Sequence, residues 1–138
     1  IAGDDTHGHV DDLARFTSEN TIVLASESDK NDQNCAVLST NLHVLKHETG
    51  LQGTKLKVVE LPMPRPVFYD GQRLPASYAN FYIANGCVLV PTFHDPNDRI
   101  ALNTLAKLFP GRDVIGIHCV DMVLGLGTLH CGTMQEPA

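Results

Sequence analysis

Short apolar runs alternate with polar turns along the 138-residue chain and predict two similar supersecondary units. In the first unit, the apolar residues 13–16 and the β-branched run 21–25 indicate two strands joined by a polar hairpin loop. A helix is expected from about Asp32, and residues 56–61 have the composition of a buried strand. The apolar positions of this helix recur three and four residues apart on one face: Cys35, Leu38, Leu42 and Leu45.

The second unit begins with another strand pair. Residues 78–83 and 87–90 are predicted to pair, and the Asn85-Gly86 dipeptide between them is a strong hairpin signal. A repeat unit of this kind rarely buries its own hydrophobic face, so the two units are expected to pack against neighbours.

The helix of the second unit is expected to begin near Asp95 or Asp98, either of which can cap it. Its predicted buried face consists of Leu102, Leu105, Ala106 and Phe109. A buried strand is expected at 114–119, so both units have the order strand, strand, helix, strand. The proline-rich residues 62–77 between the units are predicted to form a long ordered loop.

Composition is typical of a globular domain, with 43% hydrophobic and 19% charged residues. The formal charge of −6 argues against nucleic acid or an anionic membrane as partner and weakly favours a cationic ligand. No apolar run is long enough to span a bilayer. The four cysteines lack CxxC spacing and a disulfide framework would be unusual here, so a reducing, cytoplasmic location is expected.

Two polar segments could carry chemistry. Residues 3–12 hold two imidazoles and four carboxylates, and residues 125–131 place Cys131 after a glycine-broken loop. A thiol beside such a loop, with histidines elsewhere in the fold, is the sequence form of a nucleophile and its acid/base partner. The alternatives are that Cys131 is an inert core thiol and that the acidic cluster caps or solvates a loop. His7, His118 and His130 are interpreted as hydrogen-bonding or surface groups rather than catalysts.

A zinc site is a further alternative. His7, His9 and Asp11 have the H-x-H-x-D form that some metallohydrolases use. The motif is short and frequent by chance, so it is the weaker interpretation. The side chains that could complete such a zinc shell are His118, Cys119, His130 and Cys131.

Six segments together resemble the agmatine deiminases, which belong with the Porphyromonas-type peptidylarginine deiminases. They extend over nearly the whole chain: residues 3–16, 61–64, 74–86, 91–93, 109–112 and 129–131. The resemblance implies a pentein, an α/β propeller of five strand-strand-helix-strand units around the active site. Residues 1–138 are then expected to be a single C-terminal fragment of a pentein domain. The expected parts are unit one at about 9–62, unit two at about 78–120 and a nucleophile segment at 125–138.

The same resemblance implies the chemistry of a guanidine deiminase. Cys131 is expected to be the nucleophile, His9 the acid/base and Asp11 the carboxylate that binds the guanidinium, with Gly127 also at the substrate. The implied reaction converts agmatine and water to N-carbamoylputrescine and ammonia through an amidino-cysteine intermediate. It implies neither a metal nor an organic cofactor.

One alternative to catalysis remains open. Family chains are longer, and their N-terminal portion supplies another guanidinium-binding carboxylate, so an inactive remnant acting as a binding or assembly module is the second hypothesis. Two units of a closed propeller would leave apolar flanks uncovered, which predicts a homodimer or larger assembly.

Overall fold

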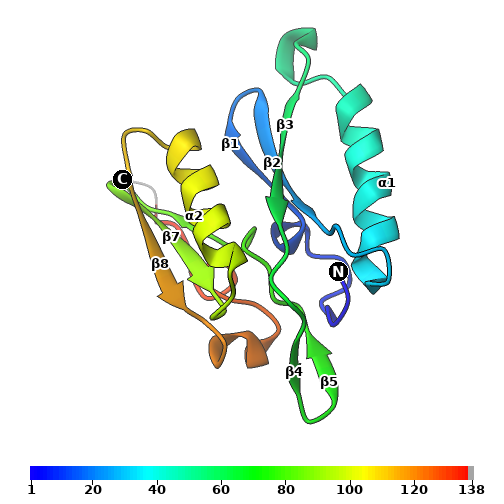
Figure 1. The fold of residues 1–138 in the computed structure, drawn as a ribbon. Coiled ribbons are helices and arrows are strands. Elements are labelled where there is room, and N and C mark those ends of the chain that lie inside the picture. Colours follow the sequence, from blue (N-terminus) through cyan, green and yellow to red (C-terminus); the bar gives the residue numbers. More distant parts are fainter. Residues whose placement is uncertain (137–138) are drawn as a thin grey trace.

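The computed structural model describes residues 1–136, which form two three-stranded sheets, each with one long helix (Figure 1). The first sheet has the order β1 (Ala14–Ser18), β2 (Thr21–Ser26), β3 (Lys57–Pro62). β1 is antiparallel to β2, whereas β3 is parallel to β2 because the chain crosses over through α1 (Gln33–His47).

The second sheet has the same arrangement. Its order is β6 (Tyr82–Ile83), β7 (Cys87–Thr92), β8 (Asp113–His118), and α2 (Asn97–Leu108) connects the parallel pair β7 and β8. The predicted order of strand, strand, helix, strand is therefore present in both halves of a mixed α/β fold. Three short 3₁₀ turns, a two-stranded hairpin and loops complete the described chain; the turns are η1 (Val10–Asp12), η2 (Leu51–Gly53) and η3 (Met122–Gly125). No helix within residues 1–136 is long and apolar enough to cross a membrane.

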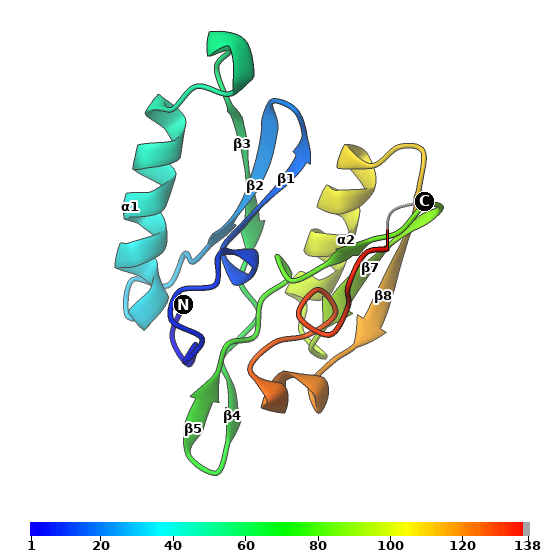
Figure 2. The ribbon, with the colours of Figure 1, turned by 180° about the vertical axis from the view of Figure 1, so that it is seen from behind.

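The main hydrophobic core joins the two sheets. α2 packs against β8 of its own sheet and also against β3 of the other, and Figure 2 shows it between them. Ala106 was predicted on the buried face of α2 but is exposed, because the helix turns Ala101, Leu105 and Phe109 inward instead. Buried side chains from both sheets and α2 form one cluster, which includes Val23, Leu61, Val88, Val90, Leu105 and Phe109.

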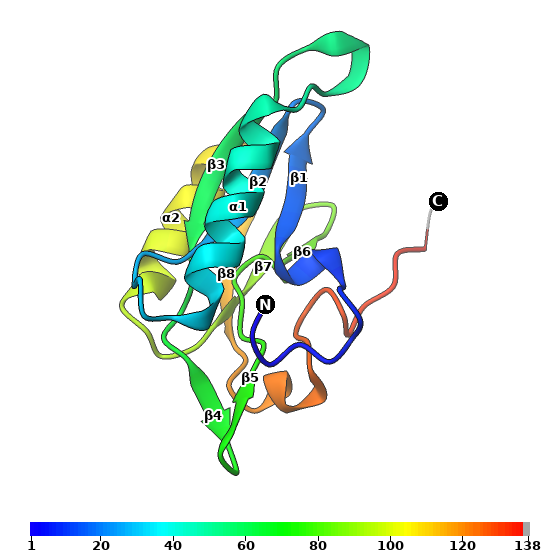
Figure 3. The same cartoon turned by 90° about the vertical axis from the view of Figure 1, so that its right-hand side faces the viewer.

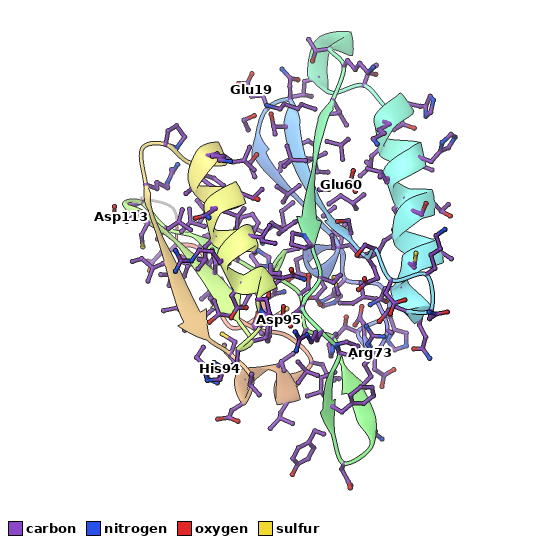
Figure 4. The ribbon with its side chains drawn as sticks, viewed as in Figure 1. Glu19, Glu60, Arg73, His94, Asp95 and Asp113 are labelled. Atoms are coloured by element: carbon purple, nitrogen blue, oxygen red, sulfur yellow. The ribbon has the colours of Figure 1, made fainter. Side chains whose placement is uncertain are left out.

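Charged and polar groups fix the start of α1. The Asp32 side chain accepts a hydrogen bond from the Asn34 backbone N–H at 2.8 Å, as an N-cap does, and pairs with the Arg73 guanidinium at 2.9 Å. Figure 4 shows Arg73 between the lower end of α1 and the β4–β5 hairpin. On the predicted apolar face only Leu38 is fully buried; Cys35, Leu42 and Leu45 are half-buried.

Residues 62–77, predicted to be a long loop, instead contain the β4 (Val67–Tyr69) and β5 (Gln72–Leu74) hairpin. Asp70 and Gly71 form its turn with φ values of 48° and 77°, which is the two-residue geometry that matches strand twist. The prolines that precede this hairpin obscured the Asp-Gly turn signal.

The predicted strand at 78–83 is wrong for its first four residues. Only Tyr82 and Ile83 pair, with β7, whereas residues 78–81 form a loop whose side chains are all buried. Their apolar character reflects burial of a loop rather than strand pairing.

Of the two carboxylates predicted to cap α2, Asp95 does so and Asp98 does not. Asp95 accepts a hydrogen bond from the Asn97 N–H at 2.8 Å, although Pro96 occupies the N-cap position. Asp98 lies inside the first turn and accepts bonds from the Phe93 N–H and the Tyr78 hydroxyl instead.

Candidate active site

The two polar segments near the ends of the chain meet in space. Figure 3 shows the N-terminal loop before η1 beside the C-terminal segment that follows η3. They enclose an open cavity of about 750 Å³. The cavity is lined by Thr6, Gly8, His9, Val10, Asp11, Gly125, Leu126, His130 and Cys131.

Asp11 is the polar centre of this cavity. Its Oδ2 atom accepts hydrogen bonds from His130 Nδ1 at 2.6 Å, Asn80 Nδ2 at 3.1 Å and the Cys131 thiol at 3.2 Å. Burial tends to raise the pKa of Asp11, but hydrogen bonds from His130 and Cys131 outweigh burial and lower the pKa below its usual value. Asp11 is therefore a carboxylate at neutral pH. The bond to Asp11 confirms the interpretation of His130 as a hydrogen-bonding group.

Cys131 faces an environment that favours the neutral thiol. Burial raises the pKa of Cys131, and the carboxylates Asp11 and Asp12 add to this effect. A hydrogen bond from Asn80 acts in the opposite direction and favours the thiolate. The protein groups alone thus hold the pKa of this cysteine above its ordinary value.

His9 lies near Asp11 and Cys131 and follows a turn with positive φ values. His7 and Gly8 have positive φ values of 60° and 90°, and the exposed His9 follows them. One side-chain ligand atom from each of His9, Asp11 and Cys131 lies within 4.8 Å of the other two. The structure therefore brings together the three residues that the sequence singled out for catalysis.

The zinc alternative finds partial geometric support. Imidazole, carboxylate and thiolate are all zinc ligands, and His9, Asp11 and Cys131 are close enough to share an ion. Within residues 1–136 no such group includes His7, His118 or Cys119, so the predicted zinc set is not assembled.

Gly127 lies directly behind the cysteine rather than in the cavity lining. A Cβ atom at this buried position would lie 2.6 Å from both Cβ and Sγ of Cys131. This distance is shorter than the contacts that Cβ atoms make in proteins. A glycine is therefore required because the Cys131 side chain packs directly against the backbone of residue 127. The expected contact of Gly127 with substrate stays a prediction.

Sequence reasoning missed two residues of this site. Asn80 is completely buried and its side chain hydrogen-bonds to both polar segments. Arg15 donates to the Phe81 carbonyl at 2.8 Å and stacks on the Phe81 ring at 4.9 Å. The one available signal for Asn80 was a polar residue inside the apolar run 78–83, whereas the position of Arg15 had none.

Asp12 is a second carboxyl group beneath the site. It is 1% exposed, and its Oδ2 atom has no hydrogen-bond partner among the described residues. Burial, with the charges of Asp11 and Asp4, raises the pKa of Asp12 to about 7, although a bond from Asn80 partly offsets this. Asp12 is thus partly protonated at neutral pH.

We expect the variant Asp12→Asn to stabilise the protein more at pH 8 than at pH 5. The folded state retains a proton on Asp12 up to pH of about 7, while the unfolded chain releases it near pH 4, so stability falls as pH rises between these values. An amide removes this penalty, which is on the order of 4 kcal/mol for about three pH units at about 1.4 kcal/mol per unit. Urea unfolding at both pH values measures it, with exposed Asp5→Asn as control. An equal effect of Asp12→Asn at both pH values would contradict the raised pKa.

Comparison with known proteins identifies the family. The family model for Porphyromonas-type peptidyl-arginine deiminase matches residues 1–137, so the chain belongs to this family of deiminases. A candidate agmatine deiminase of Latilactobacillus sakei is 37% identical over 98% of the chain. The chain spans about two fifths of the length of the curated relatives it matches, 42% in this case.

Solved structures agree with this assignment. A candidate arginine deiminase from Porphyromonas gingivalis has a TM-score of 0.96 and 45% identity, covering 99% of this chain and 40% of that one. A cysteine-to-serine variant of C. jejuni agmatine deiminase with substrate bound has a TM-score of 0.87 and 37% identity. The match covers 94% of this chain and 37% of that one. The resemblance inferred from the sequence is confirmed, and the chain is similar to both enzymes over almost its whole length.

Proposed function

We propose that this chain carries the catalytic cysteine, histidine and one guanidinium-binding carboxylate of a guanidine deiminase that hydrolyses agmatine. The observation that supports it most is the convergence of His9, Asp11 and Cys131, whose ligand atoms lie within 4.8 Å of one another beside an open cavity. Agmatine as substrate is proposed from the names of two relatives described above, those from Latilactobacillus sakei and C. jejuni.

In the first proposed step, the thiolate of Cys131 attacks the guanidinium carbon, and a carbon–sulfur bond forms. His9 protonates one terminal nitrogen, which leaves as ammonia, and the amidino group stays on sulfur. Asp11 accepts N–H bonds from the guanidinium, whose planar fork of donors suits a carboxylate, and so orients the carbon toward sulfur.

In the second step, neutral His9 takes a proton from water, whose oxygen adds to the amidino carbon. The carbon–sulfur bond then breaks, which regenerates the Cys131 thiolate and releases N-carbamoylputrescine. The sum is agmatine plus water to N-carbamoylputrescine plus ammonia, and neither a metal nor a redox step enters it.

A cationic substrate also offers a way to ionise the nucleophile. Asp11 and Asp12 help to raise the pKa of Cys131. A guanidinium placed between Asp11 and the sulfur offsets their charge and favours the thiolate. Under this proposal the cysteine becomes reactive chiefly when a cation occupies the cavity.

The experiment that tests the function is incubation of the chain with agmatine and measurement of carbamoyl product and ammonia in equal amounts. Parallel reactions with free arginine and with a peptidyl arginine determine the substrate class. Folded protein that yields no product from any of these would favour the inactive binding or assembly module.

We also propose that the chain assembles as a homodimer or larger oligomer. β8 is an edge strand of its sheet in the described structure, and Ile115 and Ile117 on it are 43% and 36% exposed. Light scattering at micromolar concentration is expected to give at least twice the monomer mass, and Ile117→Lys should reduce it because a charge on an edge strand opposes pairing. A monodisperse wild-type monomer would contradict the proposal.

A further inference from the structure

Asn80 belongs to the loop of residues 77–81 and contacts both polar segments of the site. The residue has no exposed surface. Its side chain contacts Asp11, which is 69 positions away in sequence, and Cys131, which is 51 positions away. A buried amide with this many contacts is costly to leave unpaired, so its hydrogen bonds can be assigned one by one.

The oxygen of the side chain is identified by its donors. Asn80 Oδ1 accepts the backbone N–H groups of Thr128 and His130 at 3.0 Å and of Cys131 at 3.3 Å. Backbone N–H groups only donate, so this end of the amide must be the oxygen. The Thr128 hydroxyl donates to it as well, at 3.0 Å. One oxygen atom thus holds three residues of the nucleophile segment.

The orientation of the oxygen determines where the NH₂ group points. Nδ2 lies 3.2 Å from Cys131 Sγ, 3.1 Å from Asp11 Oδ2 and 3.0 Å from Asp12 Oδ1. An amide nitrogen carries two protons, so three acceptors share two donors. A neutral thiol donates to Asp11 at 3.2 Å and needs no donor itself, whereas a thiolate has lost that proton and gains from an N–H bond.

We propose that Asn80 is a positioning residue for Cys131, holding the cysteine segment with its carbonyl oxygen and stabilising the thiolate with its amide N–H. The thiol ionisation is a property of this chain by itself, while its catalytic meaning rests on the proposed deiminase function.

Other charges also act on the sulfur. Asp11 and Asp12 of η1 oppose ionisation, while Arg15 of β1 interacts with Cys131 through its charge. His9 has a ring nitrogen within 4.8 Å of Sγ, and His130 precedes Cys131 in the chain. Among the hydrogen bonds of the described structure, Asn80 Nδ2 is the side-chain N–H donor to Sγ. Removal of this N–H donor should therefore shift the midpoint of the thiol titration.

The variant Asn80→Asp separates the two roles. A carboxyl oxygen can replace Oδ1 for the backbone N–H groups, but the atom that replaces Nδ2 is an acceptor facing Asp11, Asp12 and sulfur. We expect the midpoint of Cys131 alkylation by iodoacetamide to rise by at least about one pH unit, which lowers the rate at a fixed pH below it about tenfold. Mass spectrometry of the Cys131 peptide separates this signal from Cys35 and Cys87.

The matched control is Thr128→Val, which removes one donor to the same Oδ1 atom and leaves Nδ2 unchanged. It should lower the melting temperature without moving the alkylation midpoint. A folded Asn80→Asp protein with the wild-type midpoint would overturn the proposal, and so would a Thr128→Val midpoint that moves equally.

A measurement on the wild-type protein keeps the test valid if Asn80→Asp does not fold. The side-chain amide NMR signal of Asn80 should titrate with the same midpoint as Cys131 alkylation, and this titration should vanish in Cys131→Ala. A signal that does not change through the thiol titration would overturn the proposal. Absence of agmatine turnover would leave both readouts intact, so failure of the proposed function is distinguishable.

Discussion

Replacement of Cys131 by alanine is expected to reduce carbamoyl product formation from agmatine to the uncatalysed background. In the proposed mechanism the sulfur forms the only covalent bond between protein and substrate, and an alanine methyl group cannot replace it. Loss of a nucleophile of this type lowers turnover on the order of 10³-fold or more. The fold should be retained, since Cys131 is exposed and not part of the core.

Cys87→Ala is the matched control for this experiment. Cys87 begins β7 and is half-buried, and it is absent from the lining of the cavity. The control should keep its turnover within about twofold of the wild-type rate, because no contact of the site changes. Turnover in Cys131→Ala equal to that of the control would exclude Cys131 as the nucleophile.

The variant Asp11→Asn is expected to move two measurements in opposite directions. Turnover of agmatine should fall on the order of 10²–10⁴-fold, because the guanidinium loses the carboxylate that orients it. Alkylation of Cys131 at neutral pH should become faster, since Asp11 contributes to the raised pKa of that thiol through a hydrogen bond and its charge.

This divergence distinguishes lost chemistry from lost structure. A misfolded site would change the alkylation rate of Cys131 by a similar factor at every pH. Removal of one charge instead lowers the midpoint of the profile of alkylation rate against pH. Glu19→Gln is a suitable control, because Figure 4 shows Glu19 at the far tip of the β1–β2 hairpin. A slower alkylation in Asp11→Asn, with the midpoint unchanged, would contradict the assigned effect of Asp11 on the thiol.

The arrangement of the regular elements was predictable because their patterns are local. The apolar spacing of α1 and the β-branched run of β2 can be found in short windows, and both elements form close to the predicted residues. The β4–β5 hairpin was missed because the prolines on either side of it outweighed the signal of its Asp70-Gly71 turn. The segment 78–81 was assigned to a strand because burial alone, without pairing, gives the same apolar composition.

The candidate site was predictable only where reactive residues lie in segments whose composition differs from the apolar core pattern. Cys131 follows a glycine-broken loop, and His9 and Asp11 stand in a dense polar segment, so the sequence itself separates them from the core pattern. Asn80 has no comparable signal, since all its side-chain partners in the site lie at least 48 positions away. Its role depends on how the two units pack, and local pattern carries no information about that packing.

The three donors that share one oxygen of Asp11 have a consequence for ligand exchange. His130, Asn80 and Cys131 already satisfy Oδ2, so an incoming molecule gains only the difference between its own hydrogen bonds and those it displaces. A guanidinium brings positive charge and a planar fork of N–H groups, and it competes well for the oxygen. The urea group of the proposed product has lost that charge and competes poorly. The donors that the substrate must displace on entry would then return to the carboxylate and assist departure of the product.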